Sequence, residues 1–162
     1  MKTTHDSETP QQGQQVITAC ACIYRINNAN HEIFLARRAK TKKFYPDTFE
    51  LIGGHIEYGE PIVDGLLREI REELHLDAIV EEPVHVFDYL NPIKSTHSVQ
   101  ITYLARFVDE HPDIVLNPED HSEYRWIAEQ HIPALFSDGK PESDKEWDAI
   151  RAAFSRLRNR TA

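Results

Sequence analysis

Residues 53–76 read GGHIEYGEPIVDGLLREIREELHL, and the architecture of this 162-residue chain can be worked out from them. Pro61 suits the first turn of a helix, because its missing N–H would have no partner there. The residues that follow repeat with the 3.6-residue period of a helix, placing apolar side chains at Ile62, Val63, Leu66, Leu67, Ile70 and Leu74. The stretch therefore predicts a glycine turn and then an amphipathic helix that packs one side on a core.

Three carboxylates lie along one flank of this helix. Successive residues advance by about 100°, so Glu69, Glu72 and Glu73 stand beside the apolar side and not opposite it. Like charges at this spacing destabilise an isolated helix by roughly a few tenths of a kcal/mol per pair, so cations must offset them. Arg68 and Arg71 are one source, which would make this a solvated acidic face. A hard divalent ion held by oxygen ligands, Mg²⁺ or Mn²⁺, is the other.

The segment from Gly54 to Leu76 resembles the signature of the Nudix hydrolase family, G-x5-E-x7-R-E-U-x-E-E-x-G-U, in which U is a bulky aliphatic residue. The matching positions are Gly54, Glu60, Arg68, Glu69, Ile70, Glu72, Glu73 and Leu76. His75 departs from the pattern, because the family has glycine there. The resemblance implies an α/β (α+β) fold, a Nudix-type α/β/α sandwich with a mixed central sheet and a loop–helix–loop catalytic motif.

The resemblance also implies roles for the residues of this box. The implied ligands of Mg²⁺ or Mn²⁺ are the backbone carbonyl of Gly53 and the carboxylates of Glu69, Glu72 and Glu73. The same carboxylates and Arg68 form the implied catalytic set, in which Arg68 holds a glutamate in its ligating orientation. Gly54 and Glu60 would support the site. Metal ions would neutralise charge on phosphoryl oxygens and lower the pKa of a bound water.

An acidic residue from a later loop often completes such a site as a base or an extra ligand. The candidates here are Glu119, Asp120 and Glu123. Each could equally be an exposed loop acid. Glu123 is the first choice, because it lies close to the end of a predicted strand.

His75 falls at the C-terminal end of the helix, where glycine usually adopts the left-handed conformation. Histidine tolerates that conformation at a cost of about 1 kcal/mol, and a cationic ring there would interact favourably with the helix dipole. The substitution touches a cap and not a ligand. We therefore expect lower stability and retained chemistry.

Strands surround this central helix in the rest of the sequence. Alternating and β-branched patterns predict strands at 15–25, 31–37, 48–52, 79–90, 98–108 and 123–127. A closing helix is predicted over 142–157, with Trp147, Ile150, Phe154 and Leu157 facing inward. Residues 1–15 are polar and read as a flexible tail, which leaves one domain over 16–162.

A basic segment and several aromatic residues are candidates for substrate binding. Arg37 and Arg38 follow the second predicted strand and precede Lys40, Lys42 and Lys43. These side chains could grip phosphate or form a solvated basic loop, and the sequence favours neither. A base-stacking ring could come from Phe44, Tyr45, Phe87, Tyr89 or Tyr103, although aromatic residues at strand positions are more often core.

Composition excludes several classes of partner. The net charge of −9 argues against a nucleic-acid binder, and apolar runs such as Val16–Tyr24 are too short to span a bilayer. Cys20 and Cys22 read as buried free thiols, which fits a reducing cytoplasm. The nine histidines show no metal-ligand spacing, so zinc is not expected. A homodimer is common for the resembled fold and stays open.

The leading interpretation is metal-dependent hydrolysis of a diphosphate linkage. The substrate would be a small phosphoanhydride, a nucleoside diphosphate linked to a moiety X, with nucleoside triphosphates and damaged nucleotides included. Two alternatives stay open: a non-catalytic nucleotide sensor or interaction module of the same fold, and an isopentenyl-diphosphate isomerase-like enzyme. The isomerase chemistry would need a cysteine, and Cys20 and Cys22 are the two available.

Overall fold

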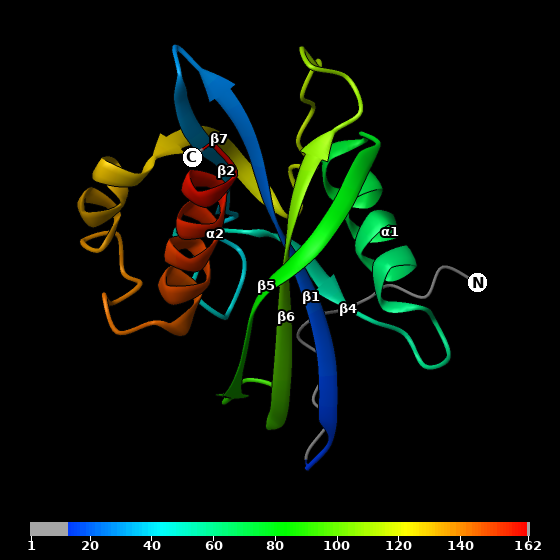
Figure 1. Cartoon of the computed structure of the whole chain (residues 1–162). Coiled ribbons are helices and arrows are strands. Elements are labelled where there is room, and N and C mark those ends of the chain that lie inside the picture. Colours follow the sequence, from blue (N-terminus) through cyan, green and yellow to red (C-terminus); the bar gives the residue numbers. More distant parts are fainter. Residues whose placement is uncertain (1–12, 162) are drawn as a thin grey trace.

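The computed structural model describes residues 13–161, and Figure 1 shows a sheet with helices on either side. The strands are β1 (Gln15–Asn27), β2 (Asn30–Arg38), β3 (Phe49–Glu50), β4 (Ile52–His55), β5 (Ala78–Asn91), β6 (Thr96–Phe107) and β7 (His121–Ala128). The helices are α1 (Ile62–Leu74), the 3-10 helix η1 (Glu129–Leu135) and α2 (Lys145–Thr161).

The sheet is mixed, with the strand order β3-β2-β1-β6-β5. β1 runs parallel to β6, whereas the β1–β2, β1–β4 and β5–β6 pairs are antiparallel. The first half of β1 pairs with β4 and β6, and its second half pairs with β2, so this long strand links the two parts of the sheet. α1 and α2 lie on opposite sides of it (Figure 1). The predicted α/β/α sandwich with a mixed central sheet is confirmed.

Each helix buries one apolar side. α1 packs Leu66, Ile70 and Leu74 into one cluster, although the predicted stripe was too wide, because Val63 is 38% exposed. α2 packs its four predicted inward residues into a second cluster, with Trp147 the largest. Burying one such side chain stabilises a fold by about 1.5–3 kcal/mol. These two faces therefore fix both helices against the sheet.

The predicted and observed boundaries differ most at the third predicted strand and at the closing helix, which spans Lys145–Thr161. The single strand expected over 48–52 is two short strands, because β3 pairs with β2 whereas β4 pairs with β1. The chain must change partners between them, at Leu51. The closing helix begins at Lys145 and not at residue 142, since the Asp144 carboxylate accepts a hydrogen bond from the Glu146 amide at 2.9 Å and caps that end.

The expected tail lies largely outside the described residues. At the first of the described residues, the Gly13 amide donates to the Ser95 carbonyl at 2.9 Å, and β1 starts at Gln15.

Cys20 and Cys22 are free and buried, as predicted, and burial raises the pKa of both thiols. No helix in residues 13–161 has the length and apolar character needed to cross a membrane.

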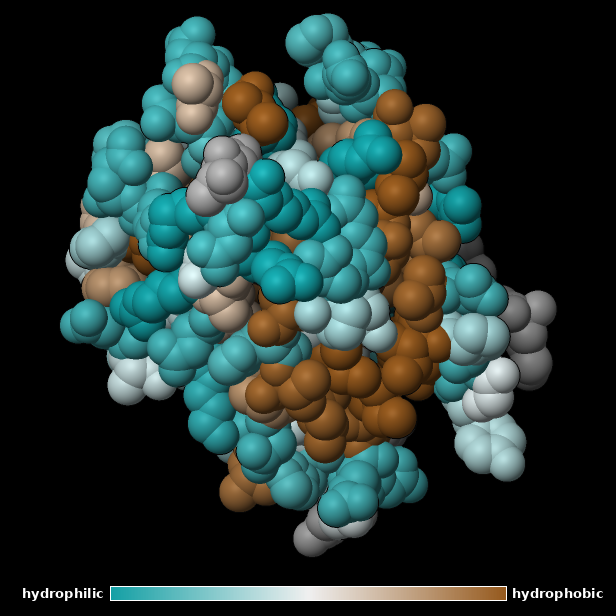
Figure 2. All heavy atoms as spheres, viewed as in Figure 1, coloured by the Kyte–Doolittle hydropathy of each residue, from teal (hydrophilic) through white to brown (hydrophobic). Residues whose placement is uncertain are grey.

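Some large apolar side chains stay exposed, including those of Ile17, Val86 and Leu90. Figure 2 shows apolar residues gathered over the part of the surface where β5 faces the viewer. Exposed apolar patches are typical of contact surfaces. The homodimer considered above stays a prediction.

His75 caps α1 in the left-handed conformation that glycine would favour, with φ 55° and ψ 33°. Its amide donates to the Arg71 carbonyl at 2.9 Å. We expect His75→Gly to raise the free energy of unfolding by up to about 1 kcal/mol, because glycine adopts this conformation without strain. Greater freedom of the unfolded chain offsets part of the gain. Denaturant unfolding should show this gain with His75→Gly and none with His75→Ala, and a loss with the glycine variant would contradict the assignment.

Candidate active site

The box glutamates line a small cavity of about 130 Å³, called here the carboxylate cavity. Its walls come from β2, β3, β4, α1 and the segment that enters β7. The lining residues are Arg38, Lys42, Glu50, Gly53, Gly54, His55, Glu69, Glu72, Glu73, Asp120 and His121. The structure thus brings the three predicted ligands on α1 together with two acids, Glu50 and Asp120, that are distant in sequence.

Arg68 connects the loop to the helix. Its guanidinium donates to Glu60 at 2.9 and 3.1 Å, to Glu69 at 2.7 Å and to the backbone carbonyl of His55 at 3.0 Å. A longer contact of 3.4 Å reaches Glu72. The hydrogen bonds to Glu60 are the largest cause that raises the pKa of Arg68. Glu60 does not line the carboxylate cavity, so its contribution is to hold Arg68.

Glu73 has an unusual electrostatic environment. Its Oε2 atom is fully buried and has no hydrogen-bond partner among the described residues. Burial raises the pKa of this carboxyl group well above its ordinary value, and the charges of Glu50, Glu69 and Asp120 raise it further. A buried, unpartnered carboxylate oxygen costs free energy. A bound cation would remove that cost.

The donor set fits a hard divalent ion, because it is made of carboxylate and carbonyl oxygens. As the side chains of residues 13–161 are placed, no three His, Cys, Asp or Glu groups converge on one point that could hold a metal. The carboxylate of Glu69 pairs instead with Arg68, at 2.7 Å.

Gly53 and Gly54, predicted as a turn, lie within β4 and fit tightly between β1 and α1. Gly53 has φ 144°, and a Cβ atom there would lie 2.1 Å from the backbone oxygen of Ala19. At Gly54 a Cβ atom would lie 2.6 Å from a carboxylate oxygen of Glu69. The two glycines are required for different reasons, since Gly53 allows close strand contact and Gly54 leaves room for a predicted ligand.

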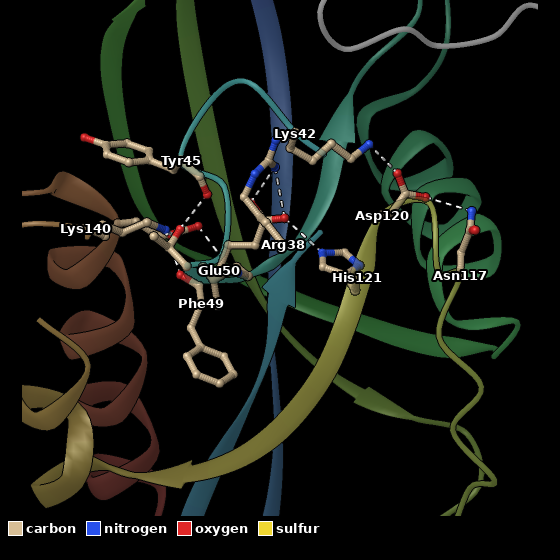
Figure 3. Close-up of polar contacts among 12 residues, drawn as sticks. Arg38, Lys42, Tyr45, Phe49, Glu50, Asn117, Asp120, His121 and Lys140 are labelled. Carbon is tan, nitrogen blue, oxygen red and sulfur yellow. Dashed lines mark hydrogen bonds and ion pairs between the residues drawn. The ribbon is translucent and has the colours of Figure 1, made fainter. Parts of the chain in front are cut away.

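A set of charged groups closes the other side of the carboxylate cavity (Figure 3). Glu50 accepts hydrogen bonds from Arg38 at 2.9 and 3.0 Å and contacts His121 Nε2 at 2.9 Å. Burial alone would raise the pKa of Glu50, but the Arg38 charge and the His121 contact lower it to about 2. Lys42 donates to Asp120 at 2.7 Å. Cationic groups therefore stand close to the acidic cluster.

The later acid that lines the carboxylate cavity is Asp120. Glu123, the first choice from sequence, instead accepts a hydrogen bond from Arg37 at 3.0 Å and does not line the carboxylate cavity. Arg37 is held there, because it also donates to Asp47 and Asp138. Of the two predicted substrate-binding arginines, the structure thus places Arg38 at the site and Arg37 outside it.

Glu50 and His121 were not predicted from the sequence. The one sequence feature that could have pointed to Glu50 is its position in a short strand, three residues before Gly53. His121 had no such signal.

A larger cavity of about 570 Å³ adjoins the first and is called here the substrate cavity. The two share Arg38, Glu50, Gly53, Gly54 and His55. Four of the five aromatic candidates line the substrate cavity, namely Phe44, Tyr45, Phe87 and Tyr89. The rings of Phe44 and Tyr89 are stacked, with centroids 6.3 Å apart. Tyr103 packs instead against the cluster beneath α1.

The substrate cavity also contains buried cations. Lys140 donates to the Phe49 carbonyl at 2.9 Å and pairs with Glu146. Lys94 is buried, and its Nζ lies 3.1 Å from His55 Nδ1. The cavity therefore combines aromatic walls with positive groups and opens onto an acidic cluster.

Residues 17–148 match the family described as the NUDIX domain, and the chain therefore belongs to the Nudix hydrolase family. Over 115 residues it is 30% identical to a Nudix hydrolase of Nostoc sp., which covers 70% of this chain and 66% of that protein. Over 104 residues it is 29% identical to the NAD-capped RNA hydrolase NudC of Stutzerimonas stutzeri, covering 64% and 34% of the two chains. This chain thus spans 34% to 66% of the length of these two relatives.

A solved structure shares the fold. The Ap4A hydrolase of C. elegans, described as a binary complex, superimposes with a TM-score of 0.70 at 18% identity, covering 89% of this chain and 98% of that one. At this identity the likeness shows the fold alone.

Proposed function

We propose that this protein hydrolyses a diphosphate linkage in a nucleoside diphosphate-X substrate with the help of Mg²⁺ or Mn²⁺. The observation that carries the proposal is the buried Glu73 oxygen without a partner, set among acids beside an aromatic-lined cavity. Clustered carboxylates of this kind need a cation. These carboxylates lie next to a pocket wide enough for a nucleoside, so a cation held by them would lie close to the phosphates of a nucleotide bound there.

Each residue has a definite task in this proposal. Glu69, Glu72, Glu73 and the Gly53 carbonyl would hold the metal, which neutralises charge on the phosphoryl oxygens when bound. Arg68 orients Glu69 and ties the loop to the helix. Asp120 takes the place first given to Glu123 as the acid that accepts the proton of the attacking water, because it lines the carboxylate cavity. Glu60 supports the site by holding Arg68.

The nucleoside part of the proposal rests on the substrate cavity. Aromatic rings at a cavity wall favour a flat heterocycle, and the neighbouring Arg38 lies where the two cavities meet. NudC is named for NAD-capped RNA and the C. elegans protein for Ap4A, so both names refer to nucleotide-containing compounds. With a net charge of −9, the chain favours small nucleotides over nucleic acid.

The test is a panel of nucleoside triphosphates, dinucleotides and nucleotide sugars, incubated with the protein and Mg²⁺ and followed by product identification. We expect release of phosphate, pyrophosphate or a nucleoside monophosphate from at least one member, and loss of that release in EDTA. No product from any member would contradict the proposal. Tight nucleotide binding without turnover would instead favour the sensor module.

An isomerase of isopentenyl diphosphate has weaker support. Cys20 borders the substrate cavity, but burial raises the pKa of its thiol, which disfavours the reactive thiolate. Unchanged activity in a Cys20→Ala, Cys22→Ala double variant would set this alternative aside.

A further inference from the structure

One face of β6 is polar although it is buried. Thr96, Ser98, Gln100 and Thr102 are each no more than 6% exposed. They alternate with His97, Val99, Ile101 and Tyr103, which point to the other face of the sheet. A buried sheet face usually carries apolar side chains, so this row calls for a reason.

Three buried polar atoms of this row have no hydrogen-bond partner among the described residues, namely Gln100 Nε2 and the hydroxyl oxygens of Thr96 and Thr102. The Ser98 hydroxyl lies next to Tyr89 and interacts with it. A buried polar atom left without a partner costs free energy. Hydroxyl groups can turn toward a neighbour, whereas the amide of Gln100 has two N–H donors in a fixed plane. Gln100 is also the member of the row that lines the substrate cavity.

The neighbours of Gln100 define what it could contact. In the sheet register it lies opposite Phe87 on β5 and Thr18 on β1, and all three line the substrate cavity. Tyr89 stands one position further along the same face of β5. The amide is thus flanked by a ring and a hydroxyl, both neutral. This setting suits the polar edge of a flat heterocycle better than a phosphate group.

We infer that Gln100 recognises the nucleobase of the substrate, donating from its side-chain NH₂ to an acceptor nitrogen or oxygen on the base edge. The inference rests on the proposed function and names the part of the substrate that the cavity selects. The face of the base would lie against the rings of the aromatic wall. The diphosphate would then extend past Arg38 and Gly53 toward the carboxylate cavity, since those residues border both cavities.

The experiment compares Gln100→Met, which keeps the length and removes both polar atoms, with Gln100→Glu, which puts an acceptor where the donor was. The matched control is Gln130→Met, at an exposed position of η1. Kinetics would be measured on the best nucleotide of the panel and on a base-free methyl diphosphate. We expect Gln100→Met to lower kcat/KM for the nucleotide at least tenfold, and Gln100→Glu to lower it further, because two acceptors repel.

Neither variant should change the turnover of the base-free compound by more than about twofold, because that compound does not reach Gln100. The control variant should behave like wild type on both substrates. Thermal unfolding checks that each variant is folded. One substitution is apolar and the other is charged, so we expect at least one of the two variants to fold and to be testable. Nucleotide kcat/KM within twofold of wild type in a folded variant would overturn the inference. If wild type hydrolyses no nucleotide, the proposed function has failed instead, whatever Gln100 does.

Discussion

Glu73→Gln is expected to lower kcat/KM at least about a hundredfold, roughly 2.7 kcal/mol in the barrier, and also to stabilise protein stripped of divalent metal. The amide keeps the shape of the side chain but cannot supply the charge that a metal needs. Stability should rise because burial and the charges of Glu50, Glu69 and Asp120 disfavour the ionised carboxylate in the fold. One substitution should therefore move activity and stability in opposite directions.

The stability gain should depend on pH with a definite sign. The folded protein raises the pKa of Glu73 above its value of about 4.3 in an unfolded chain. Ionisation of Glu73 therefore destabilises the fold. The destabilisation is complete at a pH above the pKa of the folded protein, and it is absent at a pH below the pKa of the unfolded chain. In EDTA, the stability difference between Glu73→Gln and wild type should be largest at neutral to alkaline pH. It should shrink to nothing as the pH falls through about 4.

Two matched variants isolate the cause. Glu72→Gln should lose activity to a similar extent but gain little stability, because the side chain of Glu72 is 54% exposed. Asp64→Asn, in the first turn of the same helix and exposed, should leave activity unchanged and lower stability by no more than about 1 kcal/mol, because it removes a charge that is favourable at the helix N-terminus. The measurements are steady-state kinetics with Mg²⁺ and urea unfolding with EDTA. A normal rate in Glu72→Gln and Glu73→Gln would mean that the metal site has been misassigned.

Gly53→Ala is expected to destabilise the protein by about 3 kcal/mol or more and to abolish activity. Its Cβ atom would lie 2.1 Å from the Ala19 oxygen and 2.7 Å from Cys20 Cα, both backbone atoms of the central strand. Its φ of 144° is also a conformation that other residues rarely adopt. Backbone strain and overpacking each cost about 1–3 kcal/mol, and here they add at one position.

Two other glycines provide the controls. At Gly59, with φ 81°, no atom lies within 4 Å of an added Cβ, so Gly59→Ala should cost only the left-handed strain of about 1 kcal/mol. At Gly54 the Cβ would meet only the flexible carboxylate of Glu69. Gly54→Ala should therefore lose most activity with a small loss of stability. Chemical denaturation and kinetics on the three variants test this order, and equal stability of Gly53→Ala and Gly59→Ala would contradict it.

Local patterns made much of the fold predictable. The helix over 61–74 followed from periodicity and Pro61, and the structure begins it at Ile62. The left-handed conformation at His75 was expected because this residue stands at the end of the helix, where the resembled family has glycine. Both features depend on neighbours within a few residues. The mixed sheet was expected only through the resemblance, because strand order depends on contacts between distant segments.

The choice between Asp120 and Glu123 shows where local information ended. Successive residues of a strand point to opposite faces, so Arg37 and Arg38 separate, one away from the site and the other into it. Glu123 lies opposite Arg37 in the register between β2 and β7 and pairs with it there. Asp120 lies just before β7 begins and borders the carboxylate cavity.

By itself the sequence determined the helix with its three aligned carboxylates and the family, since helix periodicity and a contiguous signature are properties of neighbouring residues. The pair Gly53-Gly54 was predicted as a turn, whereas pairing with β1 makes it part of β4. The tertiary structure alone decided that Glu50, Asp120 and His121 join the carboxylate cavity, that Arg37 does not, and that Gln100 borders the substrate cavity. Those placements depend on strand register and on packing between segments far apart in the chain, which no local pattern encodes.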